Sequence, residues 1–269
     1  MLALILQTIK KMRGSILGYT IAAAFLIWMF VSVYPSFSAQ QEQLIKVFEN
    51  YPPQLSKAFG IEAQTFLASF EGFLSGEDYS FMWPIILIIM VVSFGSAALA
   101  GEIDKGTIGI LLSQPISRVK LFLGKYLAGA LGITAFVFAS VFSAIPFALL
   151  YGVDYRLQNY LTLAVLGTLF ALALLSITML FSSFSSERGR VTLISAGLFM
   201  GMYFLKILSA LKENLAGLKY FSLFHYFDST RALLKNEIGL ESVAVFLGVI
   251  LLGTLGGIYW FNRRDIAAS

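Results

Sequence analysis

Six long runs of apolar residues constrain this chain more than any other feature of its sequence. They cover approximately residues 15–34, 81–100, 121–151, 160–181, 191–208 and 243–261. A helix needs about 20 apolar residues to cross the hydrocarbon core of a bilayer, so each run is long enough to span it. The third run is over-long and contains Pro146, which predicts a tilted or kinked helix. We therefore expect an all-α integral membrane protein with a single transmembrane domain over residues 1–269.

The composition supports lipid as the solvent of these runs. Hydrophobic residues make up 58% of the chain and charged residues only 13%, whereas about 25% of the residues of soluble domains are charged. The chain has no cysteine, which excludes a disulfide framework, a thiolate nucleophile and a cysteine-based metal site.

The distribution of Lys and Arg predicts the orientation, because short loops rich in these residues stay on the cytoplasmic side. With both termini inside, eleven basic and four acidic residues give the inner side a charge of +7. The other eight basic and eleven acidic residues give −3 outside, and the two sides sum to the net charge of +4. We expect a multi-pass protein of the cell (cytoplasmic) membrane with both termini cytoplasmic. Nucleic-acid binding would need a clustered basic face and is not expected.

Three segments outside the runs are also expected to be helical. Residues 1–14 place apolar side chains on one face and Lys10, Lys11 and Arg13 largely elsewhere, which predicts an interfacial helix. A secretory signal is the rival interpretation, but the apolar stretch is longer than a usual signal core. The outer segments 35–80 and 211–240 mix charged and apolar residues, which predicts helices outside the membrane. The first of them is either a small packed cap over the spans or a plain tether.

Ionisable residues are missing from the middle of every apolar run, since Lys125 and Lys206 lie near run ends. Ion-coupled carriers usually need such groups inside the membrane. The alternative is a sodium site built from hydroxyls and carbonyls, with the residues Ser140, Ser143, Thr168, Ser176 and Thr178. Hydroxyls in spans more often bond to their own backbone or mediate helix packing. The pattern therefore disfavours ion-coupled transport.

Catalytic and metal-binding patterns are sparse. His225 is followed by Asp228, but a histidine among interfacial aromatic residues is more often a packing residue than a general base. Residues 101–107 carry the glycines and the hydroxyl of a phosphate loop, yet no lysine follows the second glycine and no strand precedes the segment. We expect no catalytic residue, no metal and no cofactor in this chain, and no ATPase activity of its own.

The segment from Glu102 to Lys120, here called the elbow, connects the second and third runs on the predicted cytoplasmic side. Thr107 is expected to cap a short helix, and Ser117 to cap the next one. The apolar residues Ile108, Leu111 and Leu112 share one side of the short helix, with Glu102, Asp104, Lys105 and Arg118 as charged flanks. Such a ridge suits docking into the groove of a partner protein. A plain interfacial connector is the alternative.

The elbow closely resembles the signature of the permease subunits of type-2 ATP-binding-cassette (ABC) transporters. The residues that carry the resemblance are Glu102, Gly106-Thr107, Leu111-Leu112 and Pro115-Ile116-Ser117-Arg118. The likeness extends to residues 124–126, 224–228 and 261–266, so it covers essentially the whole chain. It departs from the family pattern at Ser229, where members often have proline.

The resemblance implies a permease that dimerises, binds a separate nucleotide-binding ATPase subunit and exports a substrate, with ATP and Mg²⁺ held by that partner. The residues implied in ATPase coupling are Glu102, Asp104, Gly106, Thr107, Leu111, Leu112, Pro115, Ser117 and Arg118. Glu102 and Arg118 would make charged contacts, while Leu111 and Leu112 would fill the groove of the partner. The rival functions are a non-transporting membrane anchor or sensor and an ion-coupled carrier. The spans are compatible with lipids, amphipathic drugs, peptides and small antibiotics alike.

Two patterns of small residues permit close helix approach, one at Gly197 and Gly201 and the other at Gly253 and Gly257. Packing within one chain and packing between two copies are both compatible with these patterns. In similar permeases the first and fifth spans tend to lie at the dimer seam. The resemblance therefore favours Gly197 and Gly201 as dimer contacts.

Overall fold

The computed structural model describes residues 1–40, 69–113 and 116–265. Within them it contains helices and no strand, and six helical segments are long and apolar enough to cross a membrane. These segments are Leu2–Ala39, Phe70–Ala98, Arg118–Leu150, Leu157–Phe184, Arg188–Leu211 and Leu240–Arg263. The prediction of an all-α protein with six membrane-spanning helices is confirmed. The cap residues expected between positions 41 and 68, and Pro115 of the elbow, lie outside the described residues.

The first span, α1 (Leu2–Ala39), is a single helix of 38 residues. At about 1.5 Å per residue it is far longer than the roughly 30 Å hydrocarbon core. The interfacial helix expected over residues 1–14 is therefore not a separate element, because those residues form the first turns of α1. No proline or glycine pair interrupts the chain between the two predicted pieces, so the helix continues through Gly14.

The second span begins before the predicted boundary. Helix α5 (Phe70–Leu74) runs through the π-helix η1 (Ser75–Met82) into α6 (Trp83–Ala98), whose first turn contains Pro84. These first residues belong to the predicted outer segment, yet they are packed inside the protein. The rings of Phe70 and Phe73 lie against Tyr34 of α1, with centroid distances of 5.1 and 5.5 Å.

The third span contains the break that Pro146 led us to expect. Helix α9 (Arg118–Phe142) ends at Ser143, and α10 (Ala144–Leu150) starts directly afterwards. Pro146 lies in the first turn of α10, where a backbone N–H would have no partner within the helix. The break thus removes the clash that a proline causes in the interior of a helix.

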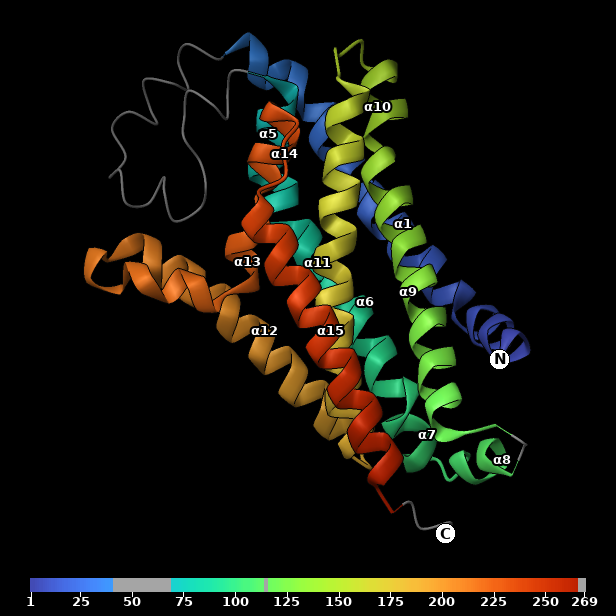
Figure 1. Cartoon of the computed structure of the whole chain (residues 1–269). Coiled ribbons are helices and arrows are strands. Elements are labelled where there is room, and N and C mark those ends of the chain that lie inside the picture. The colour runs from blue at the N-terminus through green and yellow to red at the C-terminus, as the bar shows by residue number, and fades with distance from the viewer. Residues whose placement is uncertain (41–68, 114–115, 266–269) are drawn as a thin grey trace.

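Helix α11 (Leu157–Phe184) lies at the centre of the bundle and contacts α6, α9 and α15 (Leu240–Arg263) (Figure 1). Helix α12 (Arg188–Leu211) diverges from the other helices together with the 3-10 helix η2 (Glu213–Phe221), which packs along it (Figure 1). The short helices α13 (Leu223–Tyr226) and α14 (Ser229–Lys235) lead into α15. The bundle therefore has a packed centre and one projecting arm.

The two ends of the bundle carry different elements. Helices α7 (Ala100–Asp104) and α8 (Ile108–Leu112) lie at the end where the C-terminus emerges, here called the elbow end, whereas α5, α10 and α14 lie at the opposite end (Figure 1). At the opposite end the Ser75 hydroxyl lies 3.1 Å from the Ser229 hydroxyl and 2.8 Å from that of Thr230, which joins η1 to α14.

Candidate functional site

The elbow folds as two short helices and a turn between the spans α6 and α9. Leu99, with φ −121°, separates α6 from α7, and Gly106, with φ +68°, makes the turn between α7 and α8. A positive φ is strained for most residues with a side chain, so the turn has a physical need for glycine at position 106. The sequence thus places two abrupt changes of direction within eight residues, from Leu99 to Gly106.

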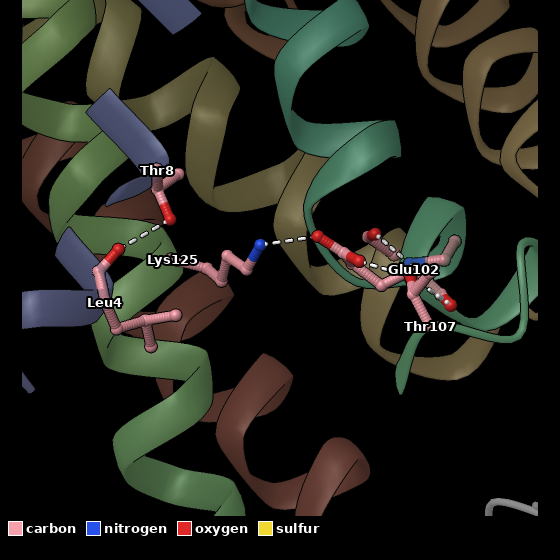
Figure 2. A network of polar contacts seen from close by, with 7 residues as sticks. Leu4, Thr8, Glu102, Thr107 and Lys125 are labelled. Atoms are coloured by element: carbon pink, nitrogen blue, oxygen red, sulfur yellow. Dashed lines mark hydrogen bonds and ion pairs between the residues drawn. The ribbon is translucent and has the colours of Figure 1, made fainter. Parts of the chain in front are cut away.

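Glu102 connects the elbow to α9 through a buried ion pair. The Lys125 ammonium donates to Glu102 Oε1 at 2.7 Å, and the two side chains are only 6% and 16% exposed (Figure 2). The Thr107 hydroxyl donates to the other carboxylate oxygen and lies 3.2 Å from the backbone oxygen of Glu102. Burial raises the pKa of the Glu102 carboxyl, but the hydrogen bonds from Lys125 and Thr107 and the charges of Lys125 and Lys11 outweigh it and lower the pKa. The Glu102 carboxyl therefore stays ionised at neutral pH and holds α7 against α9.

Thr107 and Ser117 both occupy helix N-cap positions, with different outcomes. Ser117 caps α9 as predicted, because its hydroxyl accepts from the Lys120 backbone N–H at 3.3 Å. Thr107 precedes α8, but its side chain makes no cap hydrogen bond and turns back to Glu102 instead. The predicted cap at Thr107 is therefore wrong, because the hydroxyl is turned to donate to the Glu102 carboxylate and accepts from no backbone N–H of α8.

Arg118 fastens the start of α9 to the end of α15. Its guanidinium donates to the backbone oxygen of Arg264 and lies 3.5 Å from that of Asn262. Arg264 in turn donates to the Ser185 backbone oxygen at 2.7 Å and to the Ser186 hydroxyl, both in the connection between α11 and α12. We call Arg118, Asn262 and Arg264 the clamp. The clamp therefore links the start of α9, the end of α15 and the connection between α11 and α12, which are distant from one another in sequence.

The outward surface of the elbow differs from the ridge that the sequence suggests. Ile108 is only 3% exposed, and Leu111 and Leu112 are partly buried against the core. Ile110 is instead 67% exposed, and Asp104 is exposed as well. The short α8 turns the shared side of Ile108, Leu111 and Leu112 toward the protein because that side buries the most apolar area.

The two pairs of glycines have different surroundings. A Cβ at Gly253 would lie 2.9 Å from the Ser176 Cβ, and one at Gly257 would lie 2.6 Å from the Phe122 ring. Nothing described lies within 4 Å of a Cβ placed at Gly197 or Gly201, and both residues are exposed on α12. Packing within the chain therefore accounts for the glycine pair on α15. No described residue packs against the glycine pair on α12.

The hydroxyls proposed for a sodium site are bound to the backbone of their own helices. Ser143, Thr168, Ser176 and Thr178 donate to carbonyls three or four residues earlier, at 2.6 to 2.9 Å. Ser140 donates to Val137 O at 3.1 Å and accepts from the Trp83 indole N–H at 2.9 Å. These bonds give each hydroxyl a structural role.

The aromatic motif before the last span packs onto the central helix. Phe224 and Phe227 lie 5.2 and 4.8 Å from Phe170 between ring centroids. Asp228 caps α14 by accepting from the Arg231 backbone N–H at 2.9 Å. Burial, followed by the charges of Lys219 and Lys206, lowers the pKa of His225, which keeps this imidazole neutral.

Sequence reasoning missed the partners of Glu102 and Arg118. The sequence shows only that Lys125 lies near the end of an apolar run, and it pairs neither Glu102 nor Arg118 with another residue of the chain. One signal was available for Lys125, namely a lysine placed within the first turns of an apolar run, where burial without a counter-charge is costly. No local signal pointed to the clamp, because its hydrogen bonds join residues that are 144 and 146 positions apart.

Comparison with known proteins agrees with this geometry. The family model described as "ABC-2 family transporter protein" matches residues 5–266, which is nearly the whole chain. No curated protein matches the chain. The match includes the elbow, the clamp and all six spans apart from the first three residues of α1. The chain therefore belongs to the ABC-2 family of transporter proteins and is a membrane-spanning permease component.

Proposed function

We propose that this chain is the permease subunit of an ATP-driven exporter and that a separate ATPase subunit docks on the elbow. The elbow end faces the cytoplasm in this proposal, both termini lie on that side, and the protein resides in the cell membrane. ATP and Mg²⁺ bind to the partner. The permease converts the movement of the ATPase into opening toward one side of the membrane or the other.

The observation that carries the proposal is the attachment of the elbow to two long helices. The Glu102–Lys125 ion pair links α7 to α9, and the clamp links the start of α9 to the end of α15. A buried ion pair resists separation because each charge would lose its partner in a poorly solvated place. Displacement of the elbow therefore moves α9 and α15 together.

Ile110 is the residue best placed to contact the ATPase. It is 67% exposed on α8, whereas Glu102 is committed to Lys125 and Thr107. Exposed Asp104 lies on the same connection and offers a charge for a partner. The family resemblance implies that Leu111 and Leu112 contact the ATPase directly. In this proposal they support the contact indirectly, because their side chains hold α8 against the core.

A second copy of the permease fits on the open face of α12. Gly197 and Gly201 leave room for another helix backbone, and the exposed apolar residues beside them are Leu193, Ile194, Met200 and Phe204. Close packing over small residues is a common way for membrane helices to associate. A homodimer through α12 would give the complex two elbows.

The test is an Ile110→Asp variant expressed together with its ATPase subunit. We expect the ATPase to be lost from the purified complex, because a carboxylate at the centre of an apolar contact costs several kcal/mol, or about 100-fold or more in affinity. Leu240→Asp is the matched control, since Leu240 is 87% exposed in the first turn of α15 at the opposite end. Normal recovery of the ATPase with Ile110→Asp would exclude docking on α8.

A further inference from the structure

A cavity of about 500 Å³ opens at the elbow end beside α1, α6 and α7. Lys125 of α9 and Arg188 at the start of α12 also line it. Neither the proposed ATPase contact at Ile110 nor the proposed dimer contact at Gly197 and Gly201 lines this cavity. Its charge and its shape together indicate a class of ligand.

The lining of the cavity is strongly positive. Lys11, Lys105, Lys125 and Arg188 contribute four cations, and Glu102 is the single acid in the lining. Glu102 is neutralised by Lys125, so three cations remain in excess. Among the described residues, none of these three lies in an ion pair, and Arg188 makes only a 3.5 Å contact with the Ser93 backbone oxygen.

The general excess of basic residues at this end does not explain the cluster. Lys10, Lys120 and Arg190 also lie at the elbow end, but they do not line the cavity. The three uncompensated cations come from three separate elements: α1, the turn after α7, and α12. Positive charges that converge from different helices repel one another, and an anion between them relieves this repulsion.

Apolar side chains of α1 and α6 also line the cavity. Its apolar lining residues include Met12, Tyr19, Met90 and Phe94. Met90 lies eight positions before the end of α6 at Ala98, which corresponds to about 12 Å of helix. A ligand that fills this space therefore has an anionic group at the elbow end and an apolar body that extends along α6.

We infer that the cavity binds an anionic amphiphile with a phosphate-type head group. Lys11, Lys105 and Arg188 hold the head group, and Met90 and Phe94 contact the apolar chain. The Glu102–Lys125 pair forms part of the wall, where the Lys125 ammonium is bound to the Glu102 carboxylate. This binding needs neither the ATPase nor transport, so it goes beyond the proposed function.

The test measures lipid binding to the purified, delipidated full chain without any ATPase. Long-chain phosphatidic acid is titrated beside phosphatidylcholine of the same chain length and beside inorganic phosphate, with bound lipid counted by native mass spectrometry. We expect phosphatidic acid to bind and phosphatidylcholine to bind about tenfold more weakly. Inorganic phosphate is expected not to displace the bound lipid, because it lacks the apolar body.

Two variants separate head group from chain. The triple variant Lys11→Gln, Lys105→Gln, Arg188→Gln should weaken phosphatidic acid binding about tenfold to hundredfold. The matched control Lys10→Gln, Lys120→Gln, Arg190→Gln removes the same charge from the same end and should leave binding unchanged. Ala97→Phe fills the cavity without changing charge and should weaken binding of the same lipid.

Several results would overturn the inference. Equal affinity for phosphatidic acid and phosphatidylcholine would show that the cavity has no preference for an anionic head group. An equal loss of phosphatidic acid affinity in both triple variants would show that binding depends on the total positive charge of this end and not on the three cavity residues. Displacement by inorganic phosphate would show a site for the free anion alone. Unchanged lipid binding with an altered oligomeric state in the first triple variant would make the cavity an interface between copies of the chain.

Discussion

Helices α11 and α12 follow one another in the chain and are both apolar, yet they have opposite positions in the protein. In the most apolar window of each helix, 67% of the residues are buried for α11 and 17% for α12. Lipid tails and protein interiors are equally apolar, so both positions require the same kind of sequence. The position of each helix in the bundle therefore has to be inferred from the residues that it contacts.

The glycines also differ between the two helices. On the α11 side, Gly253 of α15 lets the backbone approach Ser176, whose hydroxyl lies 2.8 Å from that of Tyr126. On α12, Gly197 and Gly201 face open space. Small residues thus permit close packing at one helix, whereas no described residue packs against those of the other. Substitution of these glycines therefore tests the difference between the two helices.

The largest expected effect is that of Gly253→Leu. Its Cβ would lie 3.0 Å from the backbone carbon and oxygen of Ser176, which cannot move without shifting α11. We expect destabilisation of more than about 3 kcal/mol, at or beyond the upper end of overpacking effects. Thermal unfolding of the purified protein measures it, with Gly197→Leu as the matched control. Equal melting temperatures for the two variants would contradict the contrast.

Glu102→Gln should have the next largest effect. It leaves the Lys125 ammonium buried without its counter-charge, which costs about 3 kcal/mol, at the low end for broken buried pairs because Glu102 is partly exposed. Glu187→Gln is the control, since the Glu187–Arg190 pair at the start of α12 is 3.6 Å apart and well exposed. A similar loss of stability in both variants would show that the Lys125 pair is not effectively buried.

The same ion pair predicts a dependence of stability on pH. Because the folded pKa of Glu102 is lowered, its contribution is present above the ordinary pKa of 4.5 and is lost as the pH falls through the lowered value. The wild type should therefore lose more stability than Glu102→Gln between neutral pH and acid pH below 4.5. Parallel denaturation curves at both pH values measure this difference, and identical losses would contradict it.

Gly201→Leu should leave the protomer intact and act on association. Nothing described lies within 4 Å of the added Cβ, so unfolding should stay close to that of the wild type. If α12 forms the seam between two copies, the larger side chain separates them, and the dimer fraction in cross-linking or mass photometry falls. An unchanged dimer fraction would place the seam elsewhere.

The smallest effect is expected for Leu193→Ala on the exposed face of α12. Leu193 is 75% exposed, so its removal should change the unfolding free energy of the protomer by less than about 0.5 kcal/mol. The matched variant Leu174→Ala in α11 removes a side chain with 0% exposure and should cost about 2–5 kcal/mol. Similar values for the two would show that burial does not distinguish α11 from α12.

The sequence was sufficient for the fold class because hydropathy alone detects spans, and the elbow was recognisable by its motif. It was insufficient for the position of each helix, as α11 and α12 show. The ion pair of Glu102 with Lys125 also escaped prediction, because it depends on how α7 approaches α9 in space. The π-helix η1 had no signal in the sequence pattern, and it places Asp78 at 1% exposure within a segment expected to lie outside the membrane.

The clamp also has a consequence for biosynthesis. Arg118 is translated long before Asn262 and Arg264, whose carbonyls it binds, so the start of α9 stays unfastened while most of the chain emerges from the ribosome. The contact between Arg118 and the end of α15 forms only after α15 has been made. A chain that is cut short before Asn262 therefore lacks this fastening, and the start of its α9 stays unattached to α15.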